Sequence, residues 1–188
     1  THEYPMLSLG NTYNQEELQE FDKRIIKQLG HNDYQYVCEL KFDGLSISIH
    51  YENGKMLRAV TRGDGSKGDV VTDNVRTIKA LRTQLGGSFP EKMEVRGEVF
   101  MHRPAFDRMN MERDEAGEAL YANPRNVASG TLKLQDSAEV AKRPLDIYLY
   151  QLIEKNETIK THFDSLLKMQ AWGLRTSEHA RLCVNIDE

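Results

Sequence analysis

Cys38-Glu39-Leu40-Lys41-Phe42-Asp43-Gly44 puts a lysine at the end of a predicted strand, one residue before an Asp-Gly turn. In such a strand Val37, Glu39 and Lys41 would point to the same face. A plain core strand rarely carries a carboxylate and an amine side by side. We therefore interpret Lys41 as a candidate nucleophile for nucleotidyl transfer.

The chemistry of Lys41 depends on its neighbours. A neutral lysine amine can attack phosphorus and form a P–N bond, which breaks readily once its nitrogen is protonated. Free lysine has a pKa of roughly 10.4, so burial, nearby cations or a metal must lower the pKa of the amine. We expect Arg62 to be such a cation, and Asp43 to orient the amine or help hold a divalent ion. Gly44 lets a ligand approach. Alone, Lys-x-Asp-Gly also fits a surface turn.

The composition of the 188 residues indicates one sizeable globular domain, or one domain with an appendage. Hydrophobic residues make up 39%, charged residues 29%, and the net charge is −4. No apolar run has the length to cross a bilayer, and no signal-peptide pattern is present. Cys38 and Cys183 are too few for a disulfide scaffold. We therefore expect a reducing, cytoplasmic setting without a membrane partner.

Charge is distributed unevenly along the chain. Residues 55–82 hold seven Lys/Arg against three Asp, whereas residues 1–35 hold three Lys/Arg against six Asp/Glu. A basic segment in an acidic protein is compatible with a phosphate-bearing substrate, and equally with a solvated mixed surface. The six histidines are scattered without ligand spacing, so the sequence indicates no metal site.

Hydrophobic periodicity predicts an α+β fold with antiparallel strands and interspersed helices. The predicted strands are residues 36–41, 45–51, 55–62, 93–101, 145–152 and 181–184, with hairpin turns at Asp43-Gly44 and Asn53-Gly54. The predicted helices run from an Asn14 cap to Leu29, from a Thr72 or Asp73 cap to Ile78, from Pro104, from Pro124 to about Lys133, and from a Thr161 cap to Ala171. We divide the chain into an N-terminal segment with a surface helix, residues 1–30, and a core, residues 31–188.

Two glutamates are candidates for nucleotide contacts. Glu39 shares the orientation of Lys41 and could accept a hydrogen bond from an adenine amino group, or form an ion pair with Lys41. Glu98 lies beside Gly97, which admits close approach, and could bind a ribose hydroxyl. An ordinary solvated strand face explains Glu94 equally well.

Two basic residues are candidates for phosphate contacts. Arg125 lies in the first turn of its helix, where free N–H groups and a guanidinium suit an anion. Lys133 falls near the same face about two turns later. A pair of solvated basic residues is the alternative.

Five blocks of sequence match one family together. They are Met6-Leu7-Ser8-Leu9; Glu39-Leu40-Lys41-Phe42-Asp43-Gly44; Thr61-Arg62-Gly63-Asp64-Gly65 with Asn74-Val75-Arg76-Thr77-Ile78; Glu94-Val95-Arg96-Gly97-Glu98-Val99; and Asn123-Pro124-Arg125-Asn126. In this order they resemble bacterial NAD-dependent DNA ligase over essentially the whole chain. The resemblance implies an adenylation domain with the nucleotidyltransferase fold of DNA ligases and mRNA capping enzymes. Antiparallel sheets with flanking helices are expected, incomplete at both ends.

The resemblance also implies residue roles. Lys41 would become adenylated, Glu39 would hold the adenine amino group, and Arg62 and Glu98 would contact the ribose and its surroundings. Ser8 and Leu9 would line the NAD site.

Arg125 would face phosphates at the reaction centre or of the nicked DNA. Lys133 stands where the family has arginine, which keeps the charge but loses bidentate geometry.

The implied reaction transfers AMP from NAD to Lys41, then to the 5′-phosphate of a nick, before the 3′-hydroxyl seals the strand. Expected partners are NAD, nicked double-stranded DNA and Mg²⁺, with Mn²⁺ as a substitute. Zinc is expected only in a domain outside this chain. The resemblance implies a monomeric enzyme of DNA replication and repair. We expect a piece of a longer protein that does not ligate alone.

Two other functions fit part of the pattern. An ATP-dependent ligase or capping-type nucleotidyltransferase shares the Lys-x-Asp-Gly motif, but residues 6–9 and 61–78 favour NAD. A non-catalytic nucleic-acid-binding module would bind DNA in a salt-dependent way, without a covalent adduct. The acidic net charge and the position of Lys41 argue against it.

Overall fold

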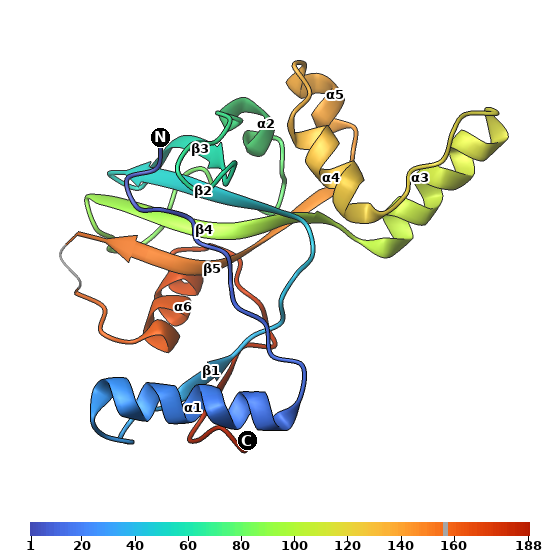
Figure 1. Cartoon of the computed structure of the whole chain (residues 1–188). Helices are drawn as coiled ribbons and strands as arrows, with labels where there is room; N and C mark the ends of the chain where they lie inside the picture. Colours follow the sequence, from blue (N-terminus) through green and yellow to red (C-terminus); the bar gives the residue numbers. More distant parts are fainter. Residues whose placement is uncertain (156–157) are drawn as a thin grey trace. The chain divides into compact units, whose positions relative to one another are not determined.

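The structure is a computed structural model that describes residues 1–155 and 158–188. The chain forms two compact units, one of residues 1–6 and 41–177, the other of residues 7–40 and 178–188. Helices and antiparallel strands alternate along the chain, which confirms the predicted α+β class (Figure 1). The division into residues 1–30 and residues 31–188 follows only the order of the sequence, and it stays a prediction.

The first unit is built on a four-stranded antiparallel sheet (Figure 1). Its strands are β2 (Leu45–Glu52), β3 (Lys55–Thr61), β4 (Lys92–Met101) and β5 (Leu145–Glu154), in the order β3-β2-β4-β5. The β2–β3 hairpin turns at Asn53 and Gly54, which have φ of 50° and 73°. Positive φ at both central positions suits Asn-Gly, so this predicted turn is confirmed.

The sheet has one apolar and one polar face, because residues opposite each other in a ladder point to the same side. Fully buried residues of the apolar face are Ile47, Ile49, Val95, Val99, Ile147 and Leu149. The polar face carries Ser46, Ser48, Glu94, Arg96, Glu98, Phe100 and Tyr148. Residues 93–101 thus alternate between the two faces, and the strand predicted there is confirmed.

The polar face of β4 is buried, so the solvated strand face considered for Glu94 is wrong. Glu94, Arg96 and Glu98 are 4%, 6% and 8% exposed. Arg96 donates hydrogen bonds to the carbonyl oxygens of Tyr4 and Pro5, at 2.6 and 3.1 Å. Residues 1–6 thus cover part of this face, a long-range contact that alternation within one strand cannot reveal.

Five helices belong to the first unit: α2 (Thr72–Arg76), α3 (Arg103–Glu115), α4 (Pro124–Leu132), α5 (Ser137–Ala141) and α6 (His162–Ala171). Thr161 caps α6 as predicted, and α4 begins at Pro124 as predicted, with Asn123 as its cap. The predicted cap of α2 is wrong. Val71 is its N-cap residue, and the Thr72 hydroxyl accepts a hydrogen bond from the Ala59 amide of β3 instead. Helix α5 was not among the elements that the sequence predicted.

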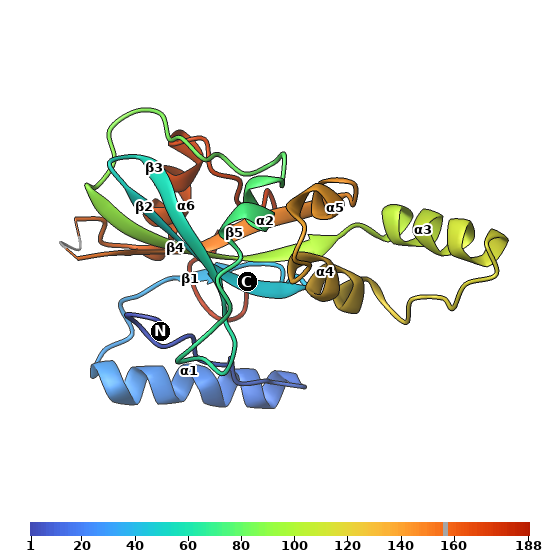
Figure 2. The ribbon, with the colours of Figure 1, turned by 90° about the horizontal axis from the view of Figure 1, so that it is seen from above.

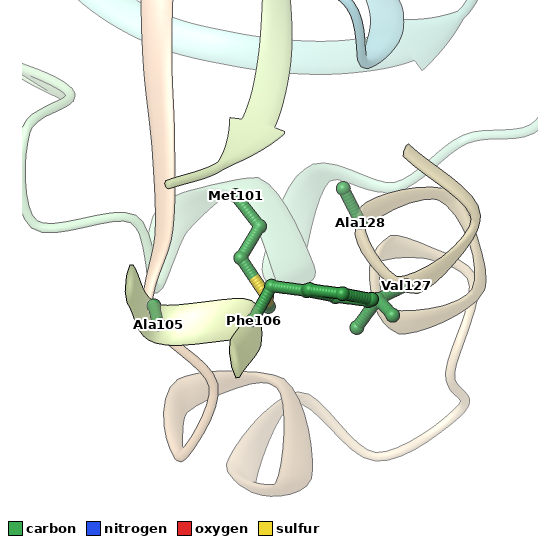
Figure 3. Packing of buried hydrophobic residues seen from close by; sticks show 5 residues of the cluster. All are labelled: Met101, Ala105, Phe106, Val127 and Ala128. Carbon is green, nitrogen blue, oxygen red and sulfur yellow. The ribbon is translucent and has the colours of Figure 1, made fainter. Parts of the chain in front are cut away.

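Helices α3 and α4 are joined by a small apolar cluster. Phe106 of α3 reaches toward Val127 of α4, and the Met101 side chain at the end of β4 reaches toward Phe106 (Figure 3). The remainder of α3 extends away from the sheet (Figure 2). This cluster fixes the start of α4 near the end of β4, which matters because Arg125 lies in the first turn of α4.

The second unit contains α1 (Gln15–Leu29), β1 (Tyr36–Cys38) and β6 (Arg181–Cys183). Asn14 caps α1 and Gly30 ends it in the left-handed region, as predicted. The hydroxyls of Tyr34 and Tyr36 donate to the Asp22 carboxylate at 2.7 and 2.6 Å, which ties β1 to the helix. These hydrogen bonds lower the pKa of Asp22.

Two predictions around β1 are wrong. The strand ends at Cys38 rather than Lys41, and it pairs with β6 instead of forming a hairpin with β2. Asp43-Gly44 is not a hairpin turn, because the Gly44 amide donates to the Glu98 carboxylate of β4. Among the helices of the described residues, none has the length and apolar character to cross a membrane.

Candidate active site

Lys41 is the first residue of the segment that leads into β2, and its side chain is exposed. The segment is fixed at Gly44, whose amide donates to Glu98 Oε1 at 3.1 Å. A Cβ at Gly44 would lie 2.1 Å from the carbonyl oxygen of Val99. The space beside Gly44, where the sequence predicted the approach of a ligand, is therefore occupied by the backbone of β4, which holds Lys41 beside that strand.

Glu98 is the buried acid of this site. Its two carboxylate oxygens accept hydrogen bonds from the Gly44 amide and from the Ser46 hydroxyl, the latter at 2.8 Å. Burial raises the pKa of Glu98, although both hydrogen bonds and the positive charges of Lys41 and Arg125 oppose the shift. Because these charges act on the carboxylate, the structure brings Lys41, Glu98 and Arg125 into one neighbourhood.

Arg62 joins the same neighbourhood from the end of β3. Its amide donates to the Ser46 carbonyl at 3.0 Å. The half-buried Tyr150 also lies there: burial and the Glu98 charge raise its pKa, while a hydrogen bond with Ser46 and the charges of Arg96 and Arg62 lower it in part. Four elements therefore converge around Ser46.

Tyr150 and Ser46 are site residues that sequence reasoning missed. Tyr150 is the extra residue of a β-bulge, since Gly97 pairs with Leu149 whereas Arg96 pairs with Gln151. Bulges re-aim side chains and are frequent next to active sites. A glycine inside a strand marks bulges, so Gly97 was the available signal, but it does not indicate which residue of the partner strand is displaced.

Arg125 and Lys133 are not brought together. Arg125 forms an ion pair with Asp43 at 2.9 Å, and Lys133 forms one with Asp69 at 2.9 Å, at the other end of α4. The helix has nine residues, so its first turn and its C-cap are about 12 Å apart. Their different partners place the two charges at opposite ends of the helix, and a shared face stays a prediction. Asp43, which lies two residues after Lys41 in the sequence, thus forms its ion pair with Arg125.

Ser8, Leu9 and Glu39 belong to the second unit, so their roles in binding NAD stay predictions. Ser8 and Leu9 are exposed, and Glu39 is half-buried. Within residues 1–155 and 158–188, no three His, Cys, Asp or Glu side chains are grouped to hold a metal ion.

Comparisons with known proteins agree in one assignment. The family model of the NAD-dependent DNA ligase adenylation domain matches residues 1–188. DNA ligases from Cytophaga hutchinsonii, Flavobacterium psychrophilum and Bacteroides fragilis are 51%, 52% and 50% identical to the chain. In each case 100% of this chain matches 28% of the relative, so the chain spans little more than a quarter of their length. The chain therefore belongs to the NAD-dependent DNA ligase adenylation domain family.

Proposed function

We propose that this chain is the adenylation part of a DNA ligase with the nucleotidyltransferase fold, and that Lys41 takes AMP from NAD. The lone pair of the Lys41 nitrogen forms a bond to the α-phosphorus of NAD. The bond from that phosphorus to the bridging oxygen breaks, and nicotinamide mononucleotide leaves with the electron pair. The amine loses a proton to solvent. The observation that carries this proposal is the exposed Lys41 held beside buried Glu98 and the basic Arg62 and Arg125.

The other site residues take roles in nucleotide binding. Glu98 and Arg62 contact the ribose and its surroundings, which agrees with their position around Ser46. Arg125 binds phosphate: its guanidinium is more than half exposed and available to exchange Asp43 for an anion. Glu39 holds the adenine amino group.

Ser8 and Leu9 line the NAD site in the proposal. Lys133 contacts DNA phosphate away from the nucleotide, since it lies at the far end of α4.

Two further transfers complete the proposed reaction in the longer protein. A 5′-phosphate oxygen of the nick attacks the phosphorus of the Lys41 adduct and takes AMP, breaking the P–N bond. The 3′-hydroxyl then attacks the activated 5′-phosphorus, so that AMP leaves and a phosphodiester forms. We keep Mg²⁺ or Mn²⁺ as the expected ion, bound mainly through substrate phosphates. A monomeric cytoplasmic enzyme acting in replication and repair on nicked double-stranded DNA is part of the same proposal.

The proposal is tested on the full-length protein with NAD and with ATP as separate AMP donors. We expect an AMP adduct from NAD only, its loss in Lys41→Ala, and its retention in Lys79→Ala, a change at another exposed lysine of the same unit. Adduct from ATP alone would instead support an ATP-dependent enzyme. Salt-dependent DNA binding without any adduct would support a binding module. Nick sealing by residues 1–188 alone would contradict the expectation that the rest of the protein is needed.

A further inference from the structure

Three aromatic rings pack against one another, each stacked on the other two, and one of them belongs to Phe42, the residue after Lys41. The centroids of Phe42 and Tyr148 are 4.5 Å apart at an interplanar angle of 28°, and those of Phe42 and Phe100 are 5.3 Å apart at 17°. Phe100 and Tyr148 are 5.4 Å apart at 13°. Phe42 and Tyr148 are half-buried and Phe100 is buried. The side chain of Phe42 thus packs the loop that carries Lys41 against β4 and β5.

A network of polar side chains, Arg175, Asp146 and His102, packs against the rings of Tyr148 and Phe100. The Arg175 guanidinium lies 4.5 Å from the centroid of the Tyr148 ring and donates to its hydroxyl at 3.0 Å. Arg175 also donates to both carboxylate oxygens of Asp146, at 2.6 and 2.7 Å. His102 contacts Asp146 at 2.7 Å and meets the Phe100 ring edge-on at 5.0 Å. Tyr148 is therefore held at its face and at its hydroxyl.

The loop is fixed on the other side of Phe42 as well. Gly44 donates to Glu98 and leaves no room for a Cβ against Val99, so the backbone at this point has one available position. Phe42 and Gly44 together therefore fix the backbone position of Lys41, the residue that precedes Phe42. Lys41 itself is exposed, and its reach toward a phosphorus atom depends on this backbone.

We propose that Phe42 is a positioning residue for Lys41, and that Arg175 assists it by holding Tyr148. The inference rests on the proposed function of Lys41 as nucleophile. A reacting amine must approach phosphorus in line, and a misplacement of about 1 Å can cost about 100-fold in rate. Phe42 is adjacent to Lys41 and packs on β4 and β5, so it restricts the backbone movement that the exposed Lys41 would otherwise have.

The test measures single-turnover adduct formation from NAD in the full-length protein. We expect Phe42→Ala to lower the rate at saturating NAD about 10- to 100-fold, with little change in the NAD concentration giving half the maximal rate. Tyr148→Phe, which keeps the ring but loses the Arg175 hydrogen bond, should lower it less. Phe42→Leu should recover part of the rate. The matched control is Phe89→Ala, a half-buried phenylalanine that packs on Gly54 at the β2–β3 turn.

Hydrogen exchange of the Phe42–Gly44 amides gives a second readout that does not depend on activity. We expect faster exchange in Phe42→Ala and unchanged exchange in Phe89→Ala. A wild-type rate of adduct formation in Phe42→Ala would overturn the positioning role, as would a Phe89→Ala rate lowered equally. If the unaltered protein forms no adduct at all, the proposed function fails, whereas the exchange result still decides whether Phe42 fixes the loop.

Discussion

The buried ion pair between Arg96 and Glu94 makes a strong prediction about stability. Arg96 Nε lies 2.6 Å from Glu94 Oε1, and their side chains are 7% and 5% exposed. The same guanidinium donates to the carbonyls of Tyr4 and Pro5, and Ser48 donates to Glu94 Oε1 at 2.8 Å. Arg96→Met removes the charge but keeps much of the volume. It leaves Glu94 buried with Ser48 as its remaining donor among those contacts.

We expect Arg96→Met to destabilise the chain by about 3–5 kcal/mol, the usual cost of leaving one partner of a buried pair uncompensated. For a chain of this length the loss corresponds to a fall in Tm of roughly 6–20 °C. Adding Glu94→Leu removes the orphaned charge, so the double variant should be more stable than Arg96→Met alone.

Equilibrium unfolding in urea, followed by circular dichroism, measures all three variants of this cycle. Glu94→Leu alone supplies the remaining corner, and it should also be costly because it leaves the Arg96 guanidinium buried without its carboxylate. A loss below about 1 kcal/mol in Arg96→Met, or a double variant whose loss equals the sum of the singles, would refute the reasoning.

Three further predictions concern the candidate site. Burial raises the pKa of Glu98 above 4.5, so the stability that its protonated form contributes is lost as pH rises through the folded pKa. Glu98→Gln should therefore gain stability relative to the unaltered chain as pH rises above 4.5, and unfolding titrations showing the opposite slope would contradict this. Gly44→Ala should lower the stability by about 1–3 kcal/mol or more and abolish adduct formation, because the added Cβ would lie 2.1 Å from the Val99 carbonyl oxygen. A soluble Gly44→Ala variant with a normal adduct yield would contradict this prediction. Arg125→Lys should change stability by less than about 1 kcal/mol, because the ion pair between Arg125 and Asp43 is exposed. The same change should lower the rate of AMP transfer about tenfold, which is the equivalent of one charge-assisted hydrogen bond. Equal transfer rates in the variant and the unaltered protein would remove Arg125 from the site.

Local patterns predicted much of this fold. The alternation of residues 93–101 gives both faces of β4, the Asn53-Gly54 turn gives the β2–β3 hairpin, and Asn14 and Thr161 cap their helices. Each signal acts over a few residues, because backbone period, φ preference and side-chain capping are local properties.

Long-range contacts account for the errors. Nothing within residues 36–44 indicates that β1 pairs with β6, 145 residues further on, so a hairpin was the natural expectation. Arg96 is held by the carbonyl oxygens of Tyr4 and Pro5, and the bulge at Tyr150 depends on the register of two strands distant in sequence. The placement of Lys41 near Glu98 agrees with the predicted site, whereas the ion pairs of Arg125 with Asp43 and of Lys133 with Asp69 join segments distant in sequence and could not be predicted from α4 alone.

The central claim is that Lys41 carries AMP, and the most direct measurement locates the adduct. The full-length protein is incubated with NAD, an acid-treated sample distinguishes the acid-labile P–N adduct from acid-stable AMP linked through oxygen, and peptides from the untreated sample are sequenced by mass spectrometry. We predict AMP on the peptide containing Lys41, lost on acid treatment because protonation of the P–N nitrogen makes it a leaving group. An adduct on another lysine, or one that persists in Lys41→Ala, would contradict the account.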